Sequence, residues 1–369
     1  MKGIVVLIKS TFENIKISGI TCAVPTTKEI LLEKYAPLFG KETVQKFSNM
    51  TGVVSRHIAL KEQTASDLAY AAAKKLVEYK NIERSSIGIL IFVTQTPDYR
   101  IPSTACVLHH RLGLSKDCVA FDINLGCSGY VYGLQTILSL MHSSNIKKGL
   151  LLVGDTSNKG IAPEDKSSCM LFGDAGAATL LEKSPGSPNI HTAMRTDGNG
   201  YKAIIIPAGA YRNIDASKKM TLWGDGNFRS DYDLYMNGTD VFNFSISEAP
   251  KLINEFMIEE NTSVDDYDML ILHQANEFIL KQLMKRTKFP KEKTPISMDR
   301  YGNTSVTSIP LTLADKYGNH FDDGMKNILM CGFGVGLSWG VVSAKINTGD
   351  ILPIIETNDY FTGGNVAHD

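Results

Sequence analysis

The sequence predicts an α/β protein built from two similar halves. Short runs rich in Val, Ile and Leu alternate with longer segments in which apolar residues recur at helical spacing. The short runs are almost continuously apolar, as expected for strands that are buried on both faces of a sheet. Similar strands and turns also recur in the same order in both halves of the chain, which indicates an internal duplication.

The strands and helices can be placed individually. Eight segments have the length and composition of buried strands: 15–20, 87–93, 118–123, 149–154, 176–182, 269–273, 327–332 and 340–345. Four segments carry apolar residues at helical spacing: 66–79, 128–143, 278–286 and 306–317. Thr64 and Asp67 have the spacing of a capping box at the start of the first helix, and Gly318 follows the last helix.

The duplication rests on matched elements. ILIF at 89–92 precedes GLLLVG at 149–154 by about 60 residues, and MLIL at 269–272 precedes NILMCG at 327–332 by a similar interval. In each half a Gly-rich turn then leads into another strand; the turns lie at 173–178 and 332–340. SPGSPN at 184–189 is typical of a linker. We therefore expect three parts: an N-terminal half over 1–185, a C-terminal half over 186–346 and an extension over 347–369.

Two segments lack clear periodicity. Residues 200–235 combine turn-forming residues with several aromatic side chains, which predicts a long excursion that serves as a lid or binding loop. The segment after Asn347 is expected to be either a loose extension or an arm that covers a sheet edge.

Composition excludes several classes of protein. The chain is 43% hydrophobic and 21% charged with a net charge of −1, so neither nucleic-acid binding nor membrane-surface binding is indicated. No run approaches the ~20 apolar residues of a membrane span. The apolar run at 3–8 stops at Lys9 without a signal-peptide cleavage pattern. None of the six cysteines forms a CxxC pair, so we expect no metal site and a cytoplasmic protein with reduced thiols.

One cysteine is placed as a nucleophile would be. Cys127 lies between a predicted strand and a strongly apolar helix, with Gly126 before it and Gly129 after it. A thiol at a helix N-terminus feels the positive end of the helix dipole, which favours the reactive thiolate. The alternative is a small buried cysteine packed as an apolar side chain. The two glycines favour the nucleophile, because they let a substrate approach the backbone closely.

Three later segments could complete a catalytic site. His273 follows a buried strand in LILHQAN, where it could equally be a hydrogen-bonded structural residue. Asn303 lies in YGNTS, where it could equally cap the helix that follows. The glycines of CGFGVGLSWG (331–340) could direct backbone N–H groups into a pocket, or could form a tight bend.

Together these segments resemble the β-ketoacyl-ACP synthase III family. GCSG with Cys127, HQAN with His273, GNTS with Asn303 and a late Gly-rich segment ending in WG occur in the family's order, within a resemblance over about residues 15–346. Four further segments are similar: TGVVSRHIA (51–59), IPSTACVLHHRLG (101–113), FGDAGAATLL (172–181) and YMNGTDVF (235–242). The resemblance implies a thiolase-like fold, five-layered αβαβα, made from two duplicated βα halves.

The resemblance also implies a reaction. Cys127 would take an acyl group from a thioester, and the N–H groups of Cys127 and Gly336 would form the oxyanion hole. His273 and Asn303 would hydrogen-bond the carbonyl of a malonyl thioester and stabilise the enolate formed as carbon dioxide leaves. His273 must then resist protonation near pH 7. No metal or permanently bound cofactor is implied; acyl-CoA or acyl-ACP carries the acyl group, so acyl carrier protein and CoA thioesters are the expected partners.

Substrate-binding residues and a homodimer follow from the same resemblance. The matching substrate-binding positions are Ile101, Gly238, Phe242, Asn276 and Phe278. Ile101 would help to complete the pocket of the neighbouring subunit, in place of the aromatic residue of well-known bacterial members. Positions at which relatives often carry a Trp and two Arg that clamp CoA hold Lys46, Met50 and Phe278 here. The chain is therefore interpreted as a specialised member rather than the housekeeping initiator of fatty acid synthesis.

Three other functions were weighed. The first is an acyltransferase of the same fold that passes the acyl group from Cys127 to an O or N nucleophile; the retained His273 and Asn303 favour condensation instead. The second is a Cys–His hydrolase, which the very apolar helix after Cys127 disfavours. The third is a non-catalytic partner subunit of a synthase pair, a role that usually involves loss of the cysteine.

Overall fold

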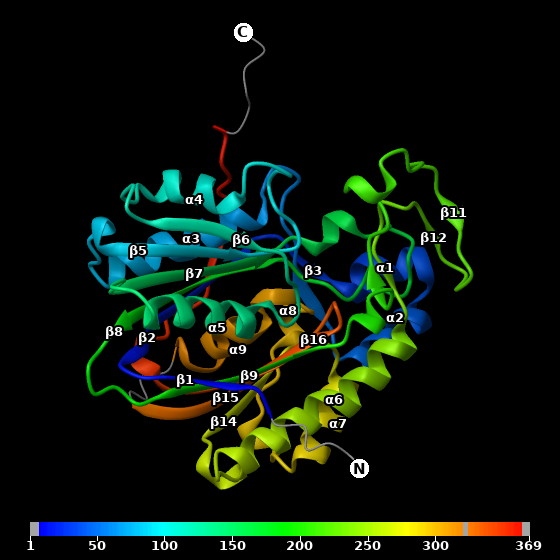
Figure 1. Ribbon diagram of the computed structural model, residues 1–369. Helices are drawn as coiled ribbons and strands as arrows, with labels where there is room; N and C mark the ends of the chain where they lie inside the picture. The colour runs from blue at the N-terminus through cyan, green and yellow to red at the C-terminus, as the bar shows by residue number, and fades with distance from the viewer. Residues whose placement is uncertain (1–6, 320–323, 364–369) are drawn as a thin grey trace.

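Helical layers and β-sheets alternate through the molecule (Figure 1). The computed structural model describes residues 7–319 and 324–363. Two central helices, α5 (Gly129–His142) and α9 (Ser308–Tyr317), lie between two large sheets. The outer faces of the sheets are covered by α3 (Ala65–Tyr79) and α4 (Thr104–Leu112) on one side and by α6 (Gly238–Glu259) and α7 (Glu277–Thr287) on the other. This is the predicted five-layered αβαβα arrangement, so the fold class is confirmed.

The sheet of the N-terminal half has the order β17-β2-β8-β7-β5-β6 in the described residues. Its strands are β2 (Ile15–Pro25), β5 (Ile87–Val93), β6 (Val119–Ile123), β7 (Lys148–Asp155), β8 (Ala175–Lys183) and β17 (Ile355–Thr357). The other large sheet has the order β1-β9-β16-β15-β14. Its strands are β1 (Lys9–Phe12), β9 (Ile190–Thr196), β14 (Met269–Leu272), β15 (Met325–Gly334) and β16 (Ser338–Asn347).

The two sheets repeat one topology. The series β2-β8-β7-β5 corresponds to β9-β16-β15-β14, and in both series two antiparallel pairings are followed by a parallel one. This repeat confirms the duplication. Two strands join the sheet of the opposite half, since β1 pairs with β9 and β17 pairs with β2. The division into residues 1–185, 186–346 and 347–369 stays a prediction.

All of the predicted strands and helices are present, with ends that shift by a few residues. The strand expected at 15–20 continues to Pro25, and the helix expected at 306–317 starts at Ser308 after a 3-10 turn over Ser305–Thr307. The capping box is confirmed, because the N–H of Thr64 donates to Asp67 Oδ2 over 2.8 Å. The sequence analysis did not identify helices α1 (Leu31–Phe39), α2 (Lys41–Thr51), α4 and α6.

Helix α5 forms the centre of the protein, as its apolar sequence predicts. Six of its apolar side chains are fully buried, whereas Leu140 is exposed; the six are Tyr130, Val131, Leu134, Ile137, Leu138 and Met141. Burial of one such side chain contributes about 1.5–3 kcal/mol. A Cβ on Gly149 of β7 would lie 2.8 Å from Met141 Sδ, so the helix packs directly on the backbone of the strand. At the N-terminus of α5, close to Cys127, a Cβ on Gly129 would lie 2.7 Å from Val93 Cγ1, so this end of the helix also packs closely on the sheet.

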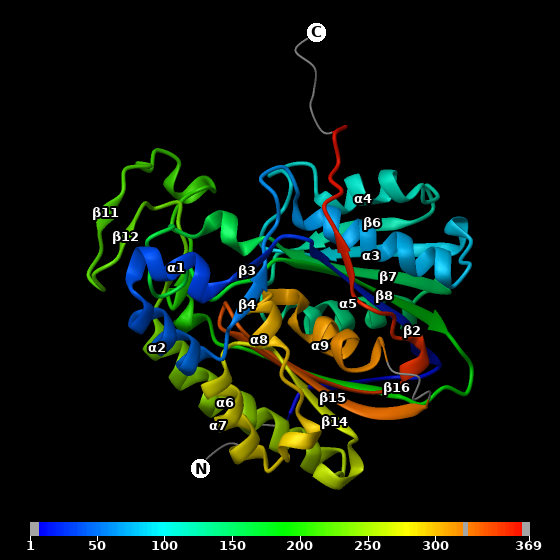
Figure 2. The ribbon, with the colours of Figure 1, turned by 180° about the vertical axis from the view of Figure 1, so that it is seen from behind.

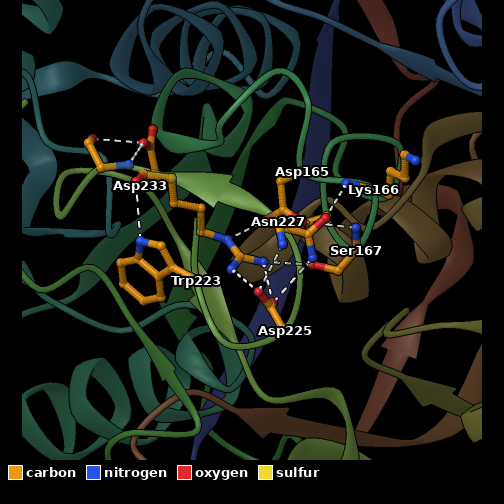
Figure 3. Close-up of polar contacts among 10 residues, drawn as sticks. Asp165, Lys166, Ser167, Trp223, Asp225, Asn227 and Asp233 are labelled. Carbon is orange, nitrogen blue, oxygen red and sulfur yellow. Dashed lines mark hydrogen bonds and ion pairs between the residues drawn. The ribbon is translucent and has the colours of Figure 1, made fainter. Parts of the chain in front are cut away.

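Residues 200–235 form an ordered excursion at one side of the molecule (Figure 1). Short antiparallel pairs run through it: β10 (Ile204–Ile205) with β13 (Tyr235–Met236), and β11 (Thr221–Leu222) with β12 (Phe228–Arg229). A fully buried arginine, Arg229, anchors it through Asp165 and Asp225, which are labelled in Figure 3. Its Nε donates to Asp165 Oδ2 over 2.7 Å, and its Nη2 donates to Asp225 Oδ2 over 2.8 Å. The use of this excursion as a lid or binding loop stays a prediction.

The C-terminal extension is an arm that covers a sheet edge. Strand β17 pairs with the edge strand β2, Gln63 Nε2 donates to the carbonyls of Thr357 and Asp359, and the N–H of Phe361 donates to Asp67 Oδ1 over 2.9 Å. The edge-covering interpretation is thus confirmed for residues up to 363. Residues 364–369 of the extension, and residues 3–6 of the apolar run at 3–8, lie outside the described residues.

Candidate active site

Cys127 lies between the end of β6 at Ile123 and the start of α5 at Gly129, and is 8% exposed. The Gly-rich end of β15 packs against it. A Cβ on Gly334 would lie 2.5 Å from Cys127 Cβ and 3.0 Å from its Sγ, so only glycine fits there. The thiol is therefore held between the start of the central helix and the Gly-rich segment that the sequence singled out.

The resting thiol is not ionised by the helix terminus. Burial raises the pKa of Cys127 to about 11, and the negative charge of Asp155 acts in the same direction. The N–H of Val335, the hydroxyl of Ser305 and the N–H of Cys127 itself act in the opposite direction but are outweighed. Desolvation of the charged sulfur therefore dominates, and the thiolate expected from the helix N-terminus is not the favoured form in the resting protein.

His273 follows β14 and is 1% exposed. Its backbone N–H donates to the carbonyl of Cys331 over 2.9 Å, and its ring Nδ1 lies 2.7 Å from Ser308 Oγ. Burial lowers the pKa of His273 to about 3, although a hydrogen bond with the backbone of Ser305 opposes this shift. The ring is thus neutral at pH 7, as the sequence analysis expected.

Asn303 is 4% exposed and is held by its backbone against residues 171–173. Its N–H donates to the carbonyl of Leu171 over 2.9 Å, and its carbonyl accepts from the N–H of Gly173 over 3.1 Å. Its Oδ1 accepts from the N–H of Ser305 over 2.9 Å. That last bond closes a local turn, but Asn303 does not cap the helix that follows, because the N-cap of α9 is Thr307 and it makes no side-chain cap bond. The carboxamide nitrogen approaches the carbonyl of Ala275 at 3.5 Å, which places it beside the HQAN segment.

Ser305 connects the three predicted catalytic residues. Its backbone N–H donates to Asn303 Oδ1, and its backbone also hydrogen-bonds His273. A hydrogen bond from its hydroxyl lowers the pKa of Cys127. It has a left-handed backbone with φ of 49°, which is uncommon for a residue other than glycine. The structure therefore brings Cys127, His273 and Asn303 to one buried centre, although they come from three distant segments.

Sequence reasoning missed two residues of this centre, Ser305 and Asp155. Ser305 lies in the YGNTS segment, in which the sequence analysis singled out only Asn303. Asp155 is buried at the end of β7, where its Oδ1 accepts from the N–H of Gln95 over 2.8 Å and from Thr94 Oγ1 over 3.1 Å. A signal was available, because β5, β6 and β7 are parallel, so the residues after them meet at one sheet edge.

The Gly-rich segment is fastened beside the nucleophile. Ser338 Oγ lies 2.6 Å from Ser128 Oγ, next to Cys127, and Ser338 Oγ also donates to the carbonyl of Val335 over 2.7 Å. Gly336 has φ of 137°, a backbone conformation that side-chain-bearing residues rarely adopt. Its assignment to the oxyanion hole stays a prediction.

The predicted substrate-binding residues lie in different surroundings. Phe242 and Phe278 stack with centroids 5.5 Å apart, and Phe278 is half exposed. Asn276 caps α7, since its Oδ1 accepts from the N–H of Ile279 over 2.8 Å. Gly238 begins α6 with open space at its Cβ position. Ile101 is 82% exposed. The chain therefore brings Phe242 and Phe278 together, and presents Ile101 outward.

Comparison with known proteins agrees with this geometry. Residues 121–198 match the family model "3-Oxoacyl-[acyl-carrier-protein (ACP)] synthase III", and residues 257–346 match the model of its C-terminal part. A β-ketoacyl-[acyl-carrier-protein] synthase III of Clostridium perfringens is 34% identical, over 87% of this chain and 96% of its own length. The chain belongs to the 3-oxoacyl-ACP synthase III family. It is thus related to condensing enzymes, which are transferases.

Other relatives support the assignment to this family. A β-ketoacyl-[acyl-carrier-protein] synthase III of Streptococcus agalactiae is 35% identical over 81% of this chain and 90% of its own length. The crystal structure of a 3-oxoacyl-(acyl-carrier protein) synthase from Burkholderia xenovorans superposes with a TM-score of 0.90 at 36% identity, covering 95% of this chain and 99% of the other. Within residues 7–319 and 324–363, no helix is long and apolar enough to cross a membrane.

Proposed function

We propose that the protein is an acyltransferase that condenses an acyl group, carried on Cys127, with a malonyl thioester. The convergence of Cys127, His273 and Asn303 on Ser305 is the observation that carries this proposal. The mechanism has two half-reactions, and each uses different residues of the centre. It needs no metal or permanently bound cofactor.

In the first half-reaction Cys127 attacks the carbonyl of an acyl thioester. The S–H bond of Cys127 breaks, a bond forms between its sulfur and the acyl carbon, and the donor leaves as a thiol. Negative charge develops on the acyl oxygen, and the N–H groups of Cys127 and Gly336 are placed to stabilise it. One such donor typically contributes a few kcal/mol to the barrier.

In the second half-reaction a malonyl thioester loses carbon dioxide and attacks the acyl group on Cys127. His273 and Asn303 donate hydrogen bonds to its thioester carbonyl as the enolate forms. The low pKa of His273 supports this role, because a neutral imidazole donates one hydrogen bond without transferring its proton. The new carbon–carbon bond yields a β-ketoacyl thioester as the bond between the acyl carbon and the sulfur of Cys127 breaks, and the released thiolate takes up a proton from solvent to restore the thiol.

The donor is proposed to be an acyl carrier protein rather than free CoA alone. The positions of the CoA clamp hold Met50 and Phe278, both exposed and apolar, and Lys46, whose ammonium pairs with Glu42 over 2.9 Å. A basic surface formed by α7 and the residues after it could bind an acidic carrier protein. A surface hollow of about 320 Å³ is lined there by Lys281, Met284, Lys285, Lys288, Phe289, Lys291 and Ile296. This combination also favours a specialised member of the family.

A homodimer is proposed from the exposed edge of the larger sheet. Strand β6 pairs only with β5 among the described strands, and Val119 at its start is half exposed. An unprotected apolar edge strand is suited to pairing with a second copy. Ile101, on a loop between β5 and β6, would then reach the pocket of the neighbouring subunit. The proposed location is the cytoplasm, where thiols such as Cys127 stay reduced.

Intact-mass measurement separates the half-reactions. The protein is incubated with acyl-CoA or acyl-carrier donors, an acyl mass on Cys127 is sought, and malonyl carrier is then added while released carbon dioxide is measured. Cys127→Ala should abolish the acyl adduct. His273→Ala and Asn303→Ala should keep the adduct but lose condensation. Normal condensation by the His273 variant would overturn the assigned roles.

Two other functions remain outcomes of the same experiment. Transfer of the acyl group from Cys127 to an alcohol or amine, without release of carbon dioxide, would indicate the O- or N-acyltransferase. Absence of any adduct with every donor would indicate the non-catalytic partner subunit of a synthase pair.

A further inference from the structure

The segment TGVVSRHIA (51–59) has no role in the proposed mechanism, yet it contacts helix residues that immediately precede Asn303. Its centre is β4 (Ser55–His57), which pairs with β3 (Lys28–Ile30). Strand β4 packs against the short helix α8 (Met298–Tyr301), which ends two residues before Asn303 (Figure 2). The position of β4 suggests that it supports the loop that carries Asn303.

The backbone of residues 301–303 crosses the backbone of residues 171–173 in close contact. A Cβ on Gly173 would lie 1.9 Å from the carbonyl oxygen of Tyr301. A Cβ on Gly302, which has φ of +67°, would lie 2.8 Å from the carbonyl oxygen of Leu171. The two hydrogen bonds between the backbone of Asn303 and residues 171 and 173 are made at this crossing. The position of the Asn303 backbone therefore depends on where residues 171–173 lie.

Arg56 hydrogen-bonds the backbone at this crossing. It is only 2% exposed, and its Nη1 donates to the carbonyl of Phe172 over 2.9 Å. Its Nη2 donates to Glu29 Oε2 over 3.1 Å and to the hydroxyl of Tyr35. The Cβ of Arg56 also lies 3.5 Å and 3.3 Å from the Cβ positions of the two glycines of the crossing. Arg56 thus fills the space beside the crossing and, together with Asn158 Nδ2 at 2.8 Å, donates to its central carbonyl.

Val54, Ser55 and His57, on either side of Arg56, contact helix α8 on the other side of the crossing. Ser55 Oγ donates to the carbonyl of Arg300 over 3.3 Å, and the N–H of Val54 donates to the carbonyl of Asp299 over 3.1 Å. The ring of His57 stacks on Tyr301 with centroids 5.5 Å apart. Residues 54–57 therefore contact both backbone segments of the crossing, 171–173 and 299–301, and so help to determine the position of Asn303.

We propose that Arg56 is a positioning residue for the condensation step, acting through Phe172 on the carboxamide of Asn303. The proposal rests on the role given to Asn303 under the proposed function. A buried arginine that only stabilised the fold would affect both half-reactions together. A positioning residue for Asn303 affects the malonyl half-reaction and spares the acylation of Cys127.

The test compares Arg56→Met and Arg56→Lys in the two half-reactions. Acylation of Cys127 is measured by intact mass, and carbon dioxide release is measured after malonyl carrier is added to the acylated protein. Arg56→Met should slow carbon dioxide release on the order of 10²-fold, the size expected for a shift of about 1 Å in a reacting group. It should leave the acylation rate nearly unchanged. Arg56→Lys keeps one donor for Phe172 and should recover part of the rate.

Arg111→Met is the matched control. The side chain of Arg111 is also largely buried, at 8% exposure, and pairs with Asp67 over 2.9 Å, but its described contacts lie on α3 and at Phe361 of the C-terminal arm. This variant should lose thermal stability without changing the ratio of the two half-reactions. If Arg56→Met lowered both rates by the same factor, its role would be structural and the proposal would be overturned.

A double variant separates this proposal from the proposed function. Because Arg56 acts through Asn303, Arg56→Met should cause no further loss in an Asn303→Ala background, whereas independent effects would multiply. Multiplied losses would overturn the proposal for Arg56. Normal condensation by Asn303→Ala would instead overturn the role of Asn303 and the proposed function with it. A defective Asn303→Ala beside a fully active Arg56→Met would overturn only the positioning role.

Discussion

The thiol of Cys127 is expected to react slowly with small alkylating agents at neutral pH. Its pKa of about 11 leaves about 0.03% of the groups ionised at pH 7.5, whereas an ordinary cysteine with a pKa of about 8.5 is about 9% ionised. Only the thiolate is nucleophilic, so the alkylation rate should be about 300-fold below that of an ordinary cysteine. The rate should rise about tenfold per pH unit from pH 7 to 10 without a plateau.

Peptide-level mass spectrometry after timed exposure to iodoacetamide measures this rate. Cys106 is exposed and must be quantified separately, while Cys22, Cys118, Cys169 and Cys331 are buried. Asp155→Asn provides a second perturbation. Its negative charge disfavours the thiolate, so its removal should lower the pKa of Cys127 and accelerate alkylation at pH 7.5.

A plateau below pH 8 would refute the reasoning. It would mean that the helix N-terminus and the N–H groups around the sulfur outweigh burial, so that the resting protein holds a thiolate. Slower alkylation of Asp155→Asn at pH 7.5, in a variant that melts at the normal temperature, would likewise contradict the effect assigned to the Asp155 charge.

Three further changes have defined outcomes. Gly334→Ala places a methyl group 2.5 Å from Cys127 Cβ and should lower the acylation rate at least tenfold. Acyl adduct formation, followed by intact mass, at the normal rate would contradict this. Ile101→Phe should shift the preferred acyl donor toward shorter chains in a competition assay, and an unchanged chain-length profile would count against contact with the pocket. Arg229→Met leaves the buried carboxylate of Asp165 unpaired and should destabilise the fold by on the order of 3–5 kcal/mol, seen as a lower melting temperature; an unchanged melting temperature would contradict this.

Elements with a regular apolar pattern could be predicted from the sequence. The strand at 87–93 is visible as a continuous apolar run, and the helix at 66–79 has a buried face visible as helical periodicity and a recognisable capping box at its start. Helix α6 was missed because its sequence is interrupted by Pro250 and is rich in aromatic and β-branched residues. Its stability comes from packing on β15 and β16, which no local pattern records.

The site could be predicted only where a residue type and its local motif indicate chemistry. Cys127, His273 and Asn303 each stand in a distinctive turn, so their convergence could be anticipated. Ser305 could not be distinguished from a helix cap, because its contacts with Cys127 and His273 depend on long-range packing. The pKa of Cys127 was misjudged for the same reason, since the sequence shows the helix terminus but not the depth of burial.

The opposite shifts of Cys127 and His273 have one physical cause. Burial raises the pKa of the thiol and lowers that of the imidazole, because both charged forms lose hydration in the same enclosed centre. A resting thiolate–imidazolium pair is therefore disfavoured on both sides, and His273 remains neutral as the condensation step requires. Negative charge must then develop only as the sulfur attacks the thioester, and the backbone N–H groups of Cys127 and the Gly-rich segment are proposed to donate hydrogen bonds to the acyl oxygen that carries it. The burial that makes the resting cysteine unreactive is thus the same property that fits the histidine for the second half-reaction.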